Sequence, residues 1–131
     1  MKGRKRHIAV DTLGLLIRVM VHKANFSDRV SVRWLLRRIP FTSRWQRVVV
    51  DAGYETDANV TWCRDWFDIS YEVVHRTGCG FVVMPRRWVV ERTFAWIGKY
   101  RRMSKDYEAL PKVSEAFIYI ASIHILARRL A

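Results

Sequence analysis

Short apolar runs separated by polar turns occur along much of the chain, and this pattern predicts its strands. Two runs rich in β-branched residues flank a polar turn, which indicates a β-hairpin over residues 7–10 and 15–22. Three further apolar runs are too short for helices and favour strands at residues 47–50, 71–75 and 81–83. The run ending at residue 50 contains three consecutive valines, Val48 to Val50, as expected of a central strand covered on both faces.

Apolar residues at helical spacing predict four helices between and after these strands. The first begins near residues 25–28 and ends before Pro40, and the last opens at Pro111. The two between them are expected over residues 56–67 and 87–102. A hairpin followed by alternating strands and helices predicts an α/β fold, with a mixed sheet and helices on its faces. Because the sequence contains no linker and no internal repeat, we interpret residues 1–131 as one domain.

The charge balance of the chain is strongly basic. Lys and Arg number 24 against 12 Asp and Glu, which gives a formal net charge of +12. Such an excess favours an anionic partner, most often nucleic acid, although a protein from a generally arginine-rich proteome would show the same balance. Half of the residues are apolar, which excludes a disordered tail.

The sequence shows no pattern for secretion or membrane insertion. Asp11 interrupts the apolar run behind the basic first residues, unlike a signal peptide. The longest apolar stretch, residues 116–126, is too short to span a bilayer and is expected to form a buried helix. Cys63 and Cys79 lack the paired spacing of zinc ligands and are interpreted as core cysteines of a reduced compartment. We therefore predict a cytoplasmic protein with no membrane partner.

Asp51 follows the apolar run 48–50 and precedes Ala52, Gly53 and Tyr54. In open α/β sheets, ligands gather at the carboxyl ends of strands, where Asp51 is predicted to lie. The alternative is an aspartate that caps a helix or a turn, which is a common role for this residue type. Both interpretations are open at this point.

Glu91 is the second candidate, and it lies in a predicted helix that is crowded with arginines. Helical spacing places four residues on the same face as Glu91, namely Arg87, Ala95, Gly98 and Lys99. Three other residues point away from this face and are expected to pack on the sheet: Val90, Phe94 and Ile97. The small residues between the cations leave room for a bulky partner. The alternative is a solvated helix with an Arg–Glu pair worth only about 0.2–0.5 kcal/mol.

Basic residues are concentrated around this glutamate. Residues 86–105 include seven basic residues, and Glu91 is the single acidic residue among them. Because solvated helices usually mix charges of both signs, we predict a phosphate-binding surface made by Arg86, Arg87, Arg92, Lys99, Arg101 and Arg102. Trp88, Trp96 and Tyr100 could stack on bases, although aromatic residues at helical spacing more often pack in a core.

Several segments resemble a known family. Residues 2–14, 50–54 and 85–96, together with 101–108, are similar to the IS5-type transposases of bacterial insertion sequences. The resemblance implies a ribonuclease-H-like fold with a catalytic triad of two aspartates and a glutamate. By position, Asp51 corresponds to the second acid and Glu91 to the third, and both would be metal ligands. The implied cofactor is Mg²⁺ or Mn²⁺, which prefers carboxylate oxygens.

The chain departs from the family pattern at three points. Met84 stands where the wider family has a tyrosine, and Gly98 stands where it has a lysine, with Lys99 next to it. The first acid belongs to a central strand upstream of the basic segment that opens this chain. Asp11 is the one acid near that place, and it fits a hairpin turn better. We therefore expect a C-terminal part of the catalytic domain, with the first, central strand missing.

The resemblance implies DNA transposition, with strand cleavage and transfer at element ends and target DNA. Without the first acid, we expect the chain to be inactive alone and to need the upstream transposase segment, encoded in the same or another frame. A homo-oligomer and an association with the bacterial nucleoid are further expectations. The alternatives are a non-catalytic basic DNA-binding fragment that modulates intact transposase, and a pseudogene relic.

Overall fold

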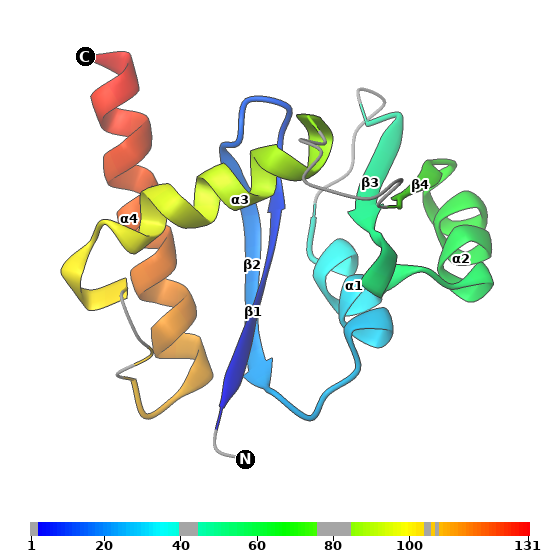
Figure 1. The fold of residues 1–131 in the computed structure, drawn as a ribbon, viewed down its shortest axis with the longest axis horizontal. Coiled ribbons are helices and arrows are strands. Elements are labelled where there is room, and N and C mark those ends of the chain that lie inside the picture. The colour runs from blue at the N-terminus through cyan, green and yellow to red at the C-terminus, as the bar shows by residue number, and fades with distance from the viewer. Residues whose placement is uncertain (1–2, 40–44, 76–84, 104–105, 107) are drawn as a thin grey trace, which may run out of the picture.

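The computed structural model describes residues 3–39, 45–75, 85–103, 106 and 108–131, shown in Figure 1. Its strands and helices are β1 Arg4–Val10, β2 Leu16–Lys23, α1 Asp28–Arg37, β3 Arg47–Asp51, α2 Asp57–Phe67, β4 Ser70–Val74, α3 Pro85–Gly98 and α4 Pro111–Leu130. Two short 3-10 turns, η1 Ala52–Tyr54 and η2 Arg101–Met103, follow β3 and α3. The predicted order of elements is confirmed, except that the run at 81–83 lies outside the described residues.

The strands form two separate pairs in the described part of the chain. β1 and β2 are antiparallel, with an irregularity in register between Ala9 and Val10. β3 and β4 are parallel and pair from Arg47 opposite Ser70 to Asp51 opposite Val74. The α/β class and the mixture of strand directions are confirmed. A single continuous sheet is not formed by these four strands, because no hydrogen-bonded pairing joins the two pairs.

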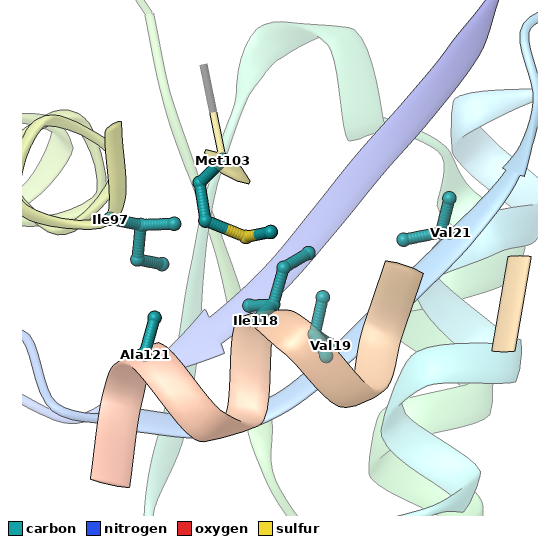
Figure 2. Close-up of a cluster of buried hydrophobic side chains, with 6 residues drawn as sticks. All are labelled: Val19, Val21, Ile97, Met103, Ile118 and Ala121. Atoms are coloured by element: carbon teal, nitrogen blue, oxygen red, sulfur yellow. The ribbon is translucent and has the colours of Figure 1, made fainter. Parts of the chain in front are cut away.

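The β1–β2 hairpin is covered on one face by α4 and the end of α3. Figure 2 shows the side chains that meet there, Val19, Val21, Ile97, Met103, Ile118 and Ala121. Val19 is fully buried and Ile118 is 1% exposed, so this cluster excludes water. Burying such aliphatic side chains contributes roughly 1.5–3 kcal/mol each, which fixes α4 along β2.

The other face of the hairpin packs against a second cluster around α1, α2 and the β3–β4 pair. Its buried members are Val32, Leu36, Ile39, Cys63 and Tyr71, and Ala9 and Ile17 of the hairpin pack against it. Because successive strand residues point to opposite faces, one hairpin serves both clusters. The prediction that Cys63 is a core cysteine is confirmed, since its side chain is 1% exposed. Cys79 lies outside the described residues.

The face of α3 that packs inward differs from the prediction. Ile97 is buried as expected, but Phe94 is 36% exposed and Thr93 is buried at 2%. Thr93 takes the inward position because its Oγ1 donates a 2.6 Å hydrogen bond to the carbonyl of Gly14 at the hairpin turn. The prediction that Phe94 packs on the sheet is wrong, because a polar contact with the turn sets the rotation of the helix.

The expectation that residues 116–126 form a buried helix holds for one side of α4, where Ile118 and Ala121 are buried. Only one side of α4 faces the hairpin, and Ile120 and Ile123 on the opposite side are 59% and 63% exposed. None of the described helices has the length and apolar character needed to cross a membrane.

Gly14 provides the first test of this architecture. It has φ of +83°, and an added Cβ would stand 3.0 Å from Thr93 Oγ1 and 3.1 Å from Arg92 Nη2. Gly14→Ala should lower the free energy of unfolding by at least about 1–2 kcal/mol, because the left-handed conformation alone costs that much in an L-residue. Urea unfolding followed by circular dichroism measures the change.

Gly98→Ala is the matched control. No atom lies within 4 Å of a Cβ built at Gly98. Alanine is also the better helix former, by roughly 0.5–1 kcal/mol. The control should be neutral or slightly stabilising. Equal stability of the two variants would contradict the close approach between the hairpin turn and α3.

Candidate functional site

Asp51 ends β3 and caps the η1 turn that follows. Its Oδ1 accepts a hydrogen bond from the backbone N–H of Gly53 at 3.0 Å. An added Cβ at Gly53 would stand 3.3 Å from this oxygen, so the glycine leaves space beside the carboxylate. The turn-capping interpretation of Asp51 is therefore confirmed. The same bond orients a half-buried carboxylate at the carboxyl end of a strand, where the metal-ligand interpretation also requires it.

The turn after Asp51 is fixed by contacts from three other elements. The carbonyl oxygen of Tyr54 accepts hydrogen bonds from Tyr71 Oη at 2.7 Å and from Asn59 Nδ2 at 3.4 Å. The phenol of Tyr54 is joined to His7 Nδ1 on β1 by a 2.6 Å hydrogen bond. Burial raises the pKa of Tyr54, and the nearby Asp28 and Asp51 carboxylates add to this, so the phenol stays protonated. The turn that follows Asp51 is consequently anchored to β1, α2 and β4.

His7 is the buried centre of this support. Burial, together with the neighbouring His22 and Lys5, lowers its pKa to about 4, although the Asp28 carboxylate acts in the opposite direction. The His22 ring is stacked on it with centroids 4.6 Å apart. His7 is therefore neutral near pH 7. His7 was not predicted from the sequence as a functional residue, but its place on the inward-facing side of an alternating strand is a pattern that could have indicated it.

Glu91 lies on the exposed side of α3. Ala95, Gly98 and Lys99, which were predicted to share its face, are exposed with it. That face is therefore open to solvent, as predicted. Arg87, the remaining member of the predicted face, and Arg86 beside it have side chains outside the described part of the structure, as does Arg102.

The other predicted phosphate-binding residues differ in their surroundings. Lys99 and Arg101 are exposed. Arg92 is half-buried, and its Nη2 donates a 2.8 Å hydrogen bond to the carbonyl of Leu13. Its guanidinium also lies 4.7 Å from the Trp96 ring centroid. Arg92 therefore has a structural role at the hairpin turn, and its contact with DNA stays a prediction.

Two guanidinium groups lie close to the Trp96 ring. Besides Arg92, Arg129 of α4 lies over its ring at 4.4 Å from the centroid. These cation–π contacts tie the hairpin turn, α3 and the end of α4 together. Because Trp96 is half-buried and occupied by these arginines, it acts as a packing residue in this structure.

Asp11, the remaining acid considered for catalysis, organises the hairpin turn. Its Oδ1 accepts hydrogen bonds from the backbone N–H groups of Leu13 and Leu15, both at 2.9 Å. The interpretation of Asp11 as a turn residue is confirmed, and these bonds account for its presence without a catalytic role.

The two elements that carry the candidate acids, β3 and α3, contact each other. α3, which carries Glu91, contacts both β1 and β3, and β3 ends at Asp51 (Figure 1). Among the residues that the structure describes, no group of three His, Cys, Asp or Glu side chains is arranged to hold a metal ion. The donor chemistry of Asp51 and Glu91 suits Mg²⁺ or Mn²⁺, but these two side chains do not amount to a complete site.

His7 makes the stability of this region pH-dependent. Its pKa is about 4 when folded and 6.5 in the reference state, so the unfolded chain binds more protons between these values. The stability contributed by neutral His7 is full above pH 6.5 and is lost as the pH falls toward 4. We expect the free energy of unfolding, measured by urea titration at several pH values, to fall over this window.

His7→Gln should flatten this dependence, since the imidazole that gains a proton is removed. His75→Gln, a change at an exposed histidine, serves as the control and should keep the wild-type slope. An unchanged slope in His7→Gln would show that groups other than His7 dominate the pH dependence.

Comparison with known proteins identifies the family. Residues 1–126 match the family model described as the transposase DDE domain. The chain is also 29% identical over 124 residues to a transposase assigned to insertion sequence element IS402 of Burkholderia cepacia. That alignment covers 88% of this chain and 59% of the relative, so the chain spans little more than half of the relative's length. No solved structure matches it significantly. The family match extends over nearly all of the chain, which therefore belongs to the transposase DDE-domain family.

Proposed function

We propose that this chain contributes Asp51 and Glu91 to the active site of a DNA transposase. The observation that carries the proposal is the position of Asp51, an oriented carboxylate at the carboxyl end of β3, on a strand that α3 contacts. Glu91 lies on an exposed face of α3, where DNA can approach. In this proposal the enzyme is of the IS5 type, and its substrates are the element ends and the target DNA.

The proposed site is completed by a segment of the transposase upstream of these strands. Two observations support this. The β1–β2 and β3–β4 pairs are not joined by hydrogen bonds in the described structure, so a ribonuclease-H-like sheet would need a further strand between them. In addition, the described residues contain no group of three His, Cys, Asp or Glu side chains arranged to hold a metal ion. The proposed upstream strand would supply both the missing pairing and the first acid.

The metal would be Mg²⁺ or Mn²⁺, held in part by Asp51 and Glu91. When bound, such an ion stabilises charge on the phosphate and activates an attacking oxygen. We assign no catalytic step to this chain alone, because two carboxylates leave the ligand set incomplete. What the chain itself supplies is the orientation of Asp51 by the Gly53 N–H and by the anchored Tyr54.

The DNA contact is proposed to lie along α3 and η2, on the side of Glu91. Lys99 and Arg101 are exposed there, and a chain with a formal charge of +12 attracts phosphates from a distance. The absence of a complete ligand group in the described residues also favours a second candidate, a non-catalytic DNA-binding chain that modulates intact transposase. The reconstitution below separates the two.

Reconstitution with the upstream segment tests the catalytic proposal. The chain alone should neither cut nor join DNA, whereas addition of the segment should give Mg²⁺-dependent strand transfer. Asp51→Asn or Glu91→Gln should then reduce the rate to background, because each removes a charged metal ligand while keeping its shape. Radiolabelled oligonucleotide strand transfer on denaturing gels measures the effect.

Asp65→Asn is the matched control, because Asp65 is an exposed aspartate on α2. It should leave strand transfer unchanged, and none of the variants should alter DNA affinity strongly. Wild-type rates in Asp51→Asn or Glu91→Gln would refute the assignment of these acids. Failure of reconstitution with DNA binding intact would favour the modulator.

Salt dependence tests the DNA-binding surface. If Lys99 and Arg101 contact phosphates, the logarithm of the affinity for duplex DNA should fall linearly with the logarithm of salt concentration. Substituting each by alanine should weaken binding to any sequence and reduce the slope by about 1 per residue. Fluorescence anisotropy at several salt concentrations measures both quantities.

Arg64→Ala provides the comparison, since Arg64 is an exposed arginine on α2. It should lower the affinity and the slope by less than either α3–η2 variant. Equal effects of all three changes would show that the whole basic surface, rather than this part of it, attracts DNA.

A further inference from the structure

An apolar seam runs along the outer side of α4. Its members are Val113, Ala116, Ile120, Ile123, Ala127 and Leu130, all of them exposed. Ile120, Ile123 and Leu130 expose 59%, 63% and 88% of their surface. The side of α4 that packs on the hairpin is a different one, formed by Ser114, Ile118, Ala121 and Ser122. The seam is therefore a second apolar face, which the described residues of the chain leave uncovered.

The spacing of the seam is that of a helix that packs against another helix. Its members follow one another at intervals of three, four, three, four and three residues over the five and a half turns of α4. This repeat averages 3.5 residues and keeps one line of side chains facing a partner helix. No charged residue interrupts the seam. An ordinary solvent-exposed helix face would carry charges at these positions.

The order of large and small residues in the seam is symmetric about its centre. From either end it reads large, small, large, large, small, large. In an antiparallel pair of identical helices, Val113 would face Leu130 of the copy and the two alanine positions would face each other. Ile120 would face Ile123. A two-fold interface needs such self-complementarity, because the same surface is used by both partners.

We propose that α4 is a dimerisation helix, and that a second copy of this chain packs antiparallel along the seam. The alanine layers let the two backbones approach, and the central isoleucines fill the space between them. Among the residues that flank the seam on the partner's side, the basic ones are Lys112 and His124. Most of the positive charge of the chain therefore lies away from the contact. The proposal does not depend on the catalytic role of Asp51 or Glu91.

A groove beside the seam adds to the fit. It has a volume of about 240 Å³ and is lined by Tyr100, Met103, Phe117, Ile120, Ala121 and His124. The Tyr100 phenol and His124 Nδ1 share a 2.6 Å hydrogen bond at this groove, which leaves their polar atoms paired. Because Ile120 belongs to both the groove and the seam, a side chain of the copy opposite Ile120 would enter the groove. In the antiparallel arrangement that side chain is Ile123.

Sedimentation equilibrium in moderate salt tests the dimer. The wild-type chain should give about twice the monomer mass of 15.6 kDa, and Ile123→Glu should return it to the monomer mass. The reason is that a carboxylate would otherwise be buried in an apolar contact without a partner. Val60→Glu, the same kind of change at a 37% exposed position on α2, should leave the dimer intact. Circular dichroism spectra of both variants check that they fold.

A wild-type chain that stays monomeric at its highest soluble concentration would overturn the proposal. A dimer that persists in Ile123→Glu would do the same, since it would use another surface. Loss of the dimer in both variants would overturn it as well, because the effect would then not be specific to α4.

Cysteine cross-linking tests the antiparallel arrangement in a Cys79→Ser background, where Cys63 is buried. Ala116→Cys and Ala127→Cys chains should form a mixed disulfide when combined under oxidising conditions. Each variant alone should cross-link at least tenfold less, because equivalent alanines lie far apart in an antiparallel pair. Efficient cross-linking of either variant with itself would indicate a parallel pair and overturn the proposed arrangement.

Discussion

The contact between the hairpin turn and α3 is the constraint on which the candidate site depends. Gly14 adopts a positive φ and brings its carbonyl within 2.6 Å of Thr93 Oγ1, while Arg92 holds the neighbouring carbonyl of Leu13. These two bonds fix the rotation of α3 about its axis. Since Thr93 points inward, Glu91 on the other side of the helix must point outward. Residues two apart lie about 200° apart around an α-helix, so the bonds that hold Thr93 inward keep Glu91 on the solvent side.

The hairpin also links the two parts of the site through packing. η1 and β3, which hold Asp51, belong to the cluster on one face of the hairpin, and Ile97 of α3 belongs to the cluster on the other. The hydrogen bond from β1 to the turn after Asp51, between His7 and Tyr54, is a direct polar tie between hairpin and site. The positions of Asp51 and Glu91 are thus set by one hairpin, although the acids are forty residues apart in sequence. Loosening the hairpin should affect both acids at once.

Local elements could be predicted from the sequence because their causes are local. Thr56 caps α2, Pro111 opens α4, and the alternating run at β1 reads as a strand without knowledge of the rest. The inward face of α3 could not be predicted, because it depends on a hydrogen bond between residues 79 positions apart. The one-sided burial of α4 has a similar origin. An apolar helix is expected to be buried on all sides, and only the tertiary structure shows that the hairpin covers one side of it.

Composition likewise indicated a basic surface but could not divide its arginines by role. Arg4 donates to the carbonyls of Glu108 and Ala109 and pairs with Asp106, and Arg92 is bound to the hairpin turn. These guanidinium groups hold distant segments together, so they contribute to the net charge without being as available to phosphates as Lys99. A count of basic residues therefore overstates the DNA-binding capacity of such a chain. Removing an arginine that holds the fold together would destabilise the chain, and an unfolded chain would also bind DNA less well. Such a variant would therefore mimic a DNA-binding defect. Only substitutions of exposed cations can separate the loss of DNA contacts from the loss of folding.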